Sequence, residues 1–242
     1  MASDRWQFLS LATLFEGGLT VLALVLAWLM GVPLLDQFHV TTHAVTLGVV
    51  STVPMLAVFL VTYRFPVGPF RAIKQFLLDA LGPALSRCHW YDLVWVAALA
   101  GFSEELLFRG VFQHWSGQLW NGWFGWCFGL VTTNILFGLA HAITPLYAVL
   151  AGLLGAYLGV LYTVEGTGNL IAPIICHSLY DLIAFFIVRQ SVLSRNPRDG
   201  SNPARATDPE SSEFPPHRRA QECIPDDFTE LQAPKTSDAT KS

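Results

Sequence analysis

The chain alternates long apolar runs with shorter segments that contain most of the charged residues. Each apolar run is close to the length of about 20 residues that a helix needs to cross a bilayer. The runs cover approximately residues 8–30, 43–63, 92–112, 124–144, 146–164 and 169–188. Between Gly110 and Val164 there is no Asp, Glu, Lys or Arg. This pattern predicts an all-α, polytopic membrane protein with about six transmembrane helices.

Two regions differ in composition. Residues 1–190 form the predicted helical membrane domain, whereas residues 191–242 hold seven of the fourteen prolines, with frequent Ser, Asp, Glu and Arg. A segment with so few apolar residues cannot bury enough surface to offset the entropy lost on ordering. We therefore predict that residues 191–242 are a disordered cytoplasmic tail and not a second domain.

The distribution of basic residues predicts the orientation in the membrane. The loops at 31–42 and 113–123 contain no Lys or Arg, whereas the loop at 64–91 contains four. Those four are Arg64, Arg71, Lys74 and Arg87. Because Lys and Arg favour cytoplasmic loops, both termini are predicted on the cytoplasmic side of a bacterial-type plasma (inner) membrane.

The 64–91 loop also shows a helical pattern. Its apolar residues recur at helical spacing, at Phe70, Ile73, Phe76, Leu77 and Leu81. Charged residues occupy the other faces of the same segment. This pattern indicates an amphipathic helix near residues 70–81 that lies on the inner surface of the membrane.

Ionisable residues within the last four apolar runs are the candidates for function. A charge at the bilayer centre costs a few kcal/mol even on lenient insertion scales, so such residues are rare unless they serve a purpose. Those that lie away from the ends of the runs are Glu104, Glu105, Arg109, His141, His177 and Asp181.

The spacing of these residues predicts which of them meet. Glu105 and Arg109 are four residues apart on one helix, so their side chains share a face and can pair. Glu104 points about 100° away from Glu105 around the helix and remains available for another role. His177 and Asp181 are also four apart, which allows the carboxylate to orient the imidazole.

An estimate of depth in the membrane places His141 at a different level from Glu104 and His177. At a rise of about 1.5 Å per residue, Glu104 and His177 both lie about 18 Å from the inner surface. His141 comes out one to two helical turns nearer the cytoplasm. One carboxylate and two imidazoles can activate water for peptide hydrolysis, with or without a metal. The same residues could also form a proton pathway or only fasten helices together.

Three motifs contain these residues and follow one another on successive apolar runs. In chain order they are Glu104-Glu105-x-x-x-Arg109, Phe137-x-x-x-His141 and His177-x-x-x-Asp181. They resemble the EExxxR, FxxxH and HxxxN/D signature of the CPBP intramembrane proteases. This family is also called ABI or CAAX-protease-like and is related to the eukaryotic Ras-converting CAAX endopeptidase. The resemblance covers about residues 92–188.

The resemblance implies a peptidase and a role for each motif residue. Glu104 would activate the attacking water together with His141. His177 and Asp181 would bind the oxyanion that develops at the scissile carbonyl, or orient the site. The residues with an implied supporting role are Glu105, Arg109 and Phe137.

The resemblance is compatible with two views of metal use. In one view a divalent ion such as zinc is held by His141 and His177, with Glu104 as a third ligand. In the other no metal is required and Glu104 activates the water. We favour the second, because using Glu104 as a ligand would leave Glu105 as the base, and its pairing with Arg109 opposes that role.

The expected partners are the lipid bilayer and a membrane-associated protein or peptide substrate. No basic patch suggests a nucleic acid. The alternative function is a catalytically inactive membrane scaffold or immunity-type protein that binds a peptide in the same cavity. A proton-coupled transporter is less favoured, because transporters usually contain internal repeats and this sequence shows none.

Overall fold

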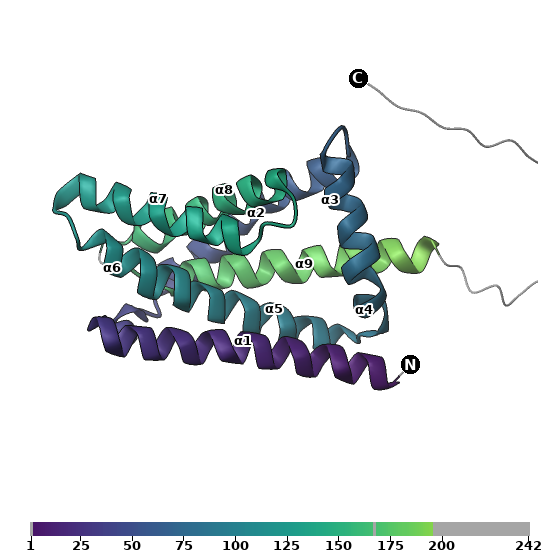
Figure 1. The fold of residues 1–242 in the computed structure, drawn as a ribbon, viewed down its shortest axis with the longest axis horizontal. Coiled ribbons are helices and arrows are strands. Elements are labelled where there is room, and N and C mark those ends of the chain that lie inside the picture. The colour runs from purple at the N-terminus through teal and green to yellow at the C-terminus, as the bar shows by residue number, and fades with distance from the viewer. Residues whose placement is uncertain (1, 167, 196–242) are drawn as a thin grey trace, which may run out of the picture. The chain divides into compact units, whose positions relative to one another are not determined.

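The computed structural model describes residues 2–166 and 168–195, and this part of the chain is helical, as predicted (Figure 1). The long helices are α1 (Ala2–Met30), α2 (Thr42–Arg64), α5 (Trp90–Glu105), α7 (Gly122–Ala140), α8 (Pro145–Thr163) and α9 (Ile171–Arg195). The short segments are η1 (Leu34–Gln37), α3 (Phe70–Phe76), η2 (Leu77–Leu81), α4 (Gly82–Arg87), η3 (Leu106–Gln113) and α6 (His114–Gly117). Residues 191–195 continue α9, although the sequence places them in the tail. The rest of the predicted tail lies outside the described residues.

The described helices suit a bilayer. Among them, α1, α2, α7, α8 and α9 are each long and apolar enough to cross a membrane. The remaining predicted span, 92–112, corresponds to α5 and to η3, which follows it without interruption. Large apolar side chains such as Trp28 and Leu153 are mostly exposed on these helices, and such a surface suits lipid and not water. The chain is therefore a multi-pass helical membrane protein.

Helices α5 and α9 occupy the middle of the bundle. Helix α5 packs against α1 on one side and α9 on another, and α9 also packs against α2 and α8. Figure 1 shows α1, α5 and α9 running alongside one another, with α7 and α8 as a second, paired layer. Because α5 carries the first motif and α9 the third, this packing brings the two motifs together.

A glycine allows α5 and α9 to approach closely. A Cβ atom at Gly101 would lie 2.8 Å from the amide nitrogen of Ser178 and 3.0 Å from its Cα. These are backbone atoms, so they cannot rotate away as a flexible side chain would. Gly101 lies three residues before Glu104, and Ser178 directly follows His177. The absence of a side chain at Gly101 therefore determines how near the first and third motifs can lie.

The loop helix predicted near residues 70–81 is present. It consists of α3 and η2, and α4 extends it to Arg87. In Figure 1 these segments run across the long helices, near the N-terminal end of α1. The Lys74 ammonium donates a hydrogen bond to the Tyr63 carbonyl (2.9 Å) and lies over the Tyr63 ring. This contact ties the loop helix to the end of α2.

Replacing Gly101 with Ala is expected to force α5 and α9 apart and to lower the free energy of unfolding by about 1–3 kcal/mol, the usual cost of overpacking. Denaturation of the purified protein in detergent would measure this change. Gly17→Ala in α1 is the matched control, because nothing lies within 4 Å of the added Cβ. Equal stability of the two variants would show that the contact at Gly101 does not limit the packing.

Candidate functional site

The first motif forms a fully buried ion pair. Arg109 Nη1 donates to Glu105 Oε1 at 2.8 Å, and neither side chain is exposed. Arg109 Nη2 also donates to the Gly155 carbonyl of α8 (2.7 Å) and contacts Asn134 Oδ1 of α7 (3.4 Å). The pairing predicted from the spacing is confirmed, and the arginine joins η3 to both helices of the second layer.

The helix changes its hydrogen-bonding pattern at this motif. Helix α5 ends at Glu105 as an α-helix, and η3 continues as a π-helix with i→i+5 bonds. A π-helical turn is wider than an α-helical one, and such turns occur often at functional sites. The change falls between the two glutamates and Arg109. It is a structural reason to look for a site beside Glu104.

His177 is held by Glu105. Its Nδ1 lies 2.7 Å from Glu105 Oε1, the same oxygen that accepts from Arg109. A carboxylate paired with an arginine can only accept, so the histidine carries its proton on Nδ1. Asp181 Oδ2 lies 3.6 Å from the opposite nitrogen, Nε2. The carboxylate that orients the imidazole through a hydrogen bond is therefore Glu105, and not Asp181 as the spacing suggests.

Glu104 faces both imidazoles. Its Oε2 lies 3.6 Å from His141 Nε2 and 4.0 Å from His177 Nε2. This oxygen is buried and has no hydrogen-bond partner among the described side chains and backbone groups. A buried polar atom without a protein partner requires an explanation, such as a bound water, an ion or a catalytic role. The space between Glu104 and the two histidines is therefore the candidate reaction centre.

His141 reaches the site because α7 is shorter than predicted. The helix ends at Ala140, whereas the sequence predicts a span to residue 144, and His141 turns out of the helix at its C-cap. Its ring stacks on Phe137 with centroids 4.4 Å apart, and its Nδ1 donates to the Phe137 carbonyl at 2.9 Å. With the proton on Nδ1, the lone pair of Nε2 points toward Glu104. The depth mismatch expected for His141 therefore does not separate it from Glu104.

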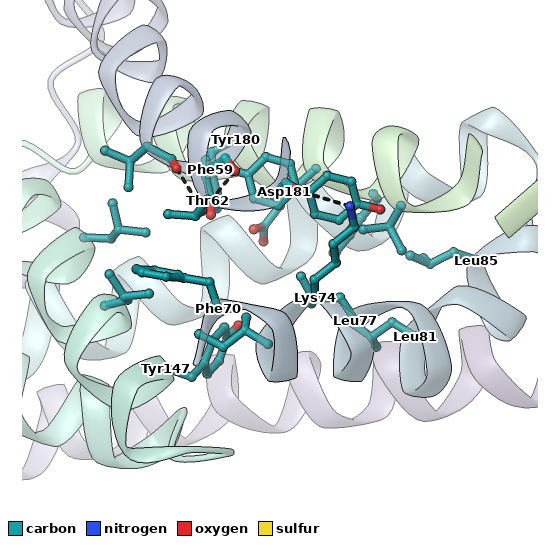
Figure 2. A pocket seen from close by; sticks show the side chains of 18 residues that line it. Phe59, Thr62, Phe70, Lys74, Leu77, Leu81, Leu85, Tyr147, Tyr180 and Asp181 are labelled. Carbon is teal, nitrogen blue, oxygen red and sulfur yellow. Dashed lines mark hydrogen bonds between the residues drawn. The ribbon is translucent and has the colours of Figure 1, made fainter. Parts of the chain in front are cut away.

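Asp181 and Phe137 complete the set of sequence-predicted residues. The Asp181 side chain is 19% exposed and lines a cavity that also contains Tyr147 and Tyr180 (Figure 2). The Phe137 ring lies under the Arg109 guanidinium, 4.6 Å from it, as well as against His141. All of the predicted site residues are thus brought into one neighbourhood by α5 with η3, the C-terminal end of α7, and α9.

Glu16 of α1 joins this neighbourhood although the sequence patterns do not select it. It is only 8% exposed, and the Ser103 hydroxyl donates to its Oε2. Glu16 is the only acidic residue in the apolar run 8–30. The criterion applied to the last four runs, an ionisable residue inside an apolar run, would have found it in the first.

The side chains do not form a metal site as they lie. Within residues 2–166 and 168–195, no group of three or more His, Cys, Asp or Glu is arranged to hold a metal ion. Nδ1 of His177 is already hydrogen-bonded to Glu105. The remaining candidate ligands are Glu104, His141 and His177 Nε2, and they face one another directly.

A comparison with known protein families agrees with this geometry. The family model described as "Type II CAAX prenyl endopeptidase Rce1-like" matches residues 86–183. Residues 86–183 are Rce1-like. The match contains all three motifs, so the resemblance to the CAAX-protease-like family is confirmed over this part of the chain. No curated protein and no solved structure matches the chain closely enough to be a relative.

Some of the residues around the candidate site lie outside the Rce1-like segment. Helices α1 and α2 and the loop helix α3 precede residue 86, so Glu16 is contributed by a region that the family model does not cover. Within the segment, α5 supplies both glutamates, the end of α7 supplies His141, and α9 supplies His177 and Asp181.

Glu105→Gln is expected to lower the free energy of unfolding by about 3–5 kcal/mol, because it leaves the Arg109 charge buried without its carboxylate. Unfolding in detergent would measure it. Asp79→Asn is the control for loss of a carboxylate on an exposed residue, and a change within about 0.5 kcal/mol is expected there. If the two variants are equally stable, the buried pair is not what holds these helices.

Proposed function

We propose that this protein is an intramembrane endopeptidase that hydrolyses a peptide bond with a water activated by Glu104. The observation that carries the proposal is the buried Glu104 Oε2, which lacks a protein partner and faces Nε2 of both His141 and His177. The Rce1-like match supports the coarser statement, a membrane endopeptidase of the CAAX-protease type.

In the first step a water lies between Glu104 and His141 and attacks the carbonyl carbon of the substrate. Glu104 takes a proton from the water as the water oxygen bonds to that carbon, so the carbonyl oxygen becomes an oxyanion. His141 accepts a hydrogen bond from the same water at Nε2, since its Nδ1 proton is committed to the Phe137 carbonyl. General base catalysis of this kind typically contributes a factor of about 10²–10⁴.

In the second step the tetrahedral intermediate collapses. In this proposal His177 is an imidazolium, which carries protons on both ring nitrogens. It donates from Nδ1 to Glu105 and from Nε2 to the oxyanion, and Asp181 Oδ2 lies 3.6 Å from that second nitrogen. Preorganised donors of this kind lower the barrier because they need no reorientation as charge develops. The proton on Glu104 passes to the leaving nitrogen as the C–N bond breaks, which yields a carboxylic acid and an amine and returns Glu104 to its carboxylate form.

The proposed substrate is a protein or peptide associated with the membrane. The site lies among helices whose outer surfaces are apolar, so a substrate held at the bilayer would reach it most readily. The description of the matching family contains the words "CAAX prenyl endopeptidase". For this chain a prenylated substrate is one option within the proposed class, which is any membrane-associated peptide that can place a carbonyl beside Glu104.

Glu104→Gln is expected to lower kcat/KM at least about 100-fold, since the amide cannot take a proton from water. Purified protein in detergent, incubated with a library of membrane-associated peptides, would show this by mass spectrometry. Its unfolding curve should match that of the unaltered protein, because Glu104 makes no hydrogen bond that the fold needs.

Two outcomes of that experiment would contradict the proposal. Equal turnover by the unaltered protein and Glu104→Gln would remove Glu104 as the base. Binding of peptides without any cleavage would favour the inactive scaffold instead. A parallel arm with a chelator tests metal use, and loss of activity that added zinc restores would overturn the metal-free form of the mechanism.

A further inference from the structure

Glu16 lies on the buried face of α1, near the middle of the helix. The buried residues of this face recur at helical spacing, at Leu9, Glu16, Ala23 and Ala27, and Glu16 is 8% exposed. Within residues 2–166 and 168–195, its carboxyl makes one hydrogen bond, with Ser103, and no ion pair. An ionisable group inside a membrane span is costly and is usually functional, so this contact requires an explanation.

A contact that only fastened α1 to α5 would not need a buried carboxyl. The same two helices share a hydrogen bond from Trp95 Nε1 to Thr13 Oγ1 (3.0 Å), made at a more exposed position. They also share the ion pair between Arg5 and Asp92 near their N-terminal ends. Burying a carboxyl costs more than burying an apolar side chain of similar size. The reason for the Glu16 contact is therefore to be sought in the part of α5 that it holds.

The contact falls on the residue directly before Glu104. Ser103 is completely buried, and its hydroxyl is bonded to Glu16 of α1. Glu105, directly after Glu104, bonds to Arg109 and to His177 of α9. Successive helical residues point about 100° apart, so these three neighbours point to three different parts of the bundle. Both sequence neighbours of Glu104 are thus held by other elements, while Glu104 itself faces the two histidines.

The bond between Glu16 and Ser103 can form whether or not the carboxyl is ionised. Ser103 Oγ is bonded to Glu16 Oε2 and also lies 3.3 Å from the Ala100 carbonyl oxygen. A hydroxyl has one proton to donate and can also accept. An ionised Glu16 accepts the Ser103 proton, whereas a protonated Glu16 donates to Ser103 Oγ, which then donates to the Ala100 carbonyl. Because neither arrangement depends on a charge, a neutral amide of the same length can replace the carboxyl.

We propose that Glu16 is a positioning residue for the proposed base. Through its hydrogen bond to Ser103 it fixes the rotation of α5 that directs Glu104 into the space between His141 and His177. The inference rests on the proposed function and adds a residue to it. Glu104 Oε2 has no hydrogen-bond partner among the described residues, so its place depends on the helix from which it projects. Helix α1, which precedes the Rce1-like segment, would thus influence the reaction.

The test compares Glu16→Leu with Glu16→Gln on a peptide that the unaltered protein cleaves. Leucine removes the hydrogen bond and is expected to lower kcat about 10–100-fold with KM changed less than about threefold, because a displaced base slows the chemical step and leaves binding intact. Glutamine keeps the bond and should hold kcat within about threefold of the unaltered protein. Thr13→Val is the matched control, since it removes a hydrogen bond between the same two helices at a more exposed position, and its kcat should be unchanged.

Ser103→Ala removes the same bond from the side of α5. It should lower kcat as much as Glu16→Leu does, and the double variant should be no slower than either single variant, because one bond can be lost only once. The double variant also leaves neither partner of the bond unpaired, which guards against misfolding. Three results would overturn the positioning role: losses in kcat that add in the double variant, a loss confined to KM, or a loss in Glu16→Gln equal to that in Glu16→Leu.

A measurement without turnover separates this inference from the proposed function. Hydrogen exchange of the backbone amides of residues 100–106, followed by mass spectrometry in detergent, reports how readily this end of α5 opens. Exchange should be faster in Glu16→Leu than in Glu16→Gln, Thr13→Val or the unaltered protein. If exchange follows this order but no peptide is cleaved, the protease proposal fails and the bond still fixes the helix that carries Glu104. If exchange is the same in all four proteins, Glu16 does not fix α5, and the inference is wrong even where peptides are cleaved.

Discussion

The structure around the site depends on one buried carboxylate, that of Glu105. It accepts from Arg109 and from His177 on the same oxygen, and Arg109 then reaches the backbone of α8. Removing a charge from water is so costly that it persists in an apolar interior only when it is paired and hydrogen-bonded. Satisfying Glu105 therefore fixes α5, η3, α8 and α9 relative to one another.

The neighbouring carboxylate has the opposite environment. Glu104 has no arginine, and its Oε2 meets only two imidazoles at distances of 3.6 and 4.0 Å, too long for direct hydrogen bonds. The two glutamates, adjacent in sequence, thus differ in their partners: Oε1 of Glu105 accepts from Arg109 and His177, whereas Oε2 of Glu104 has no hydrogen-bond partner among the described residues. The first motif requires both residues, since Glu105 positions His177, which faces Glu104.

The surroundings of this pair come from outside the Rce1-like segment as well as from within it. Helix α1 places Glu16 against Ser103, directly before Glu104. Helices α2 and α3 supply part of the lining of the cavity that Asp181 also lines. The proposed reacting groups thus lie on the segment that the family model matches, while Glu16 and part of the cavity lining lie on helices that precede it.

The sequence by itself determined the helical membrane fold, because long apolar runs without charges have no alternative that satisfies the backbone in lipid. It also predicted the Glu105–Arg109 pair, because residues four apart on a helix share a face and can pair. Contacts between helices could not be predicted from the sequence. The tertiary structure decided three further points. Glu105 and not Asp181 orients His177. Helix α7 ends early enough to turn His141 toward Glu104, and Glu16 joins these residues. Each depends on the distance and rotation between packed helices, and these are set by close contacts such as Gly101 against Ser178, which no spacing within one helix can reveal.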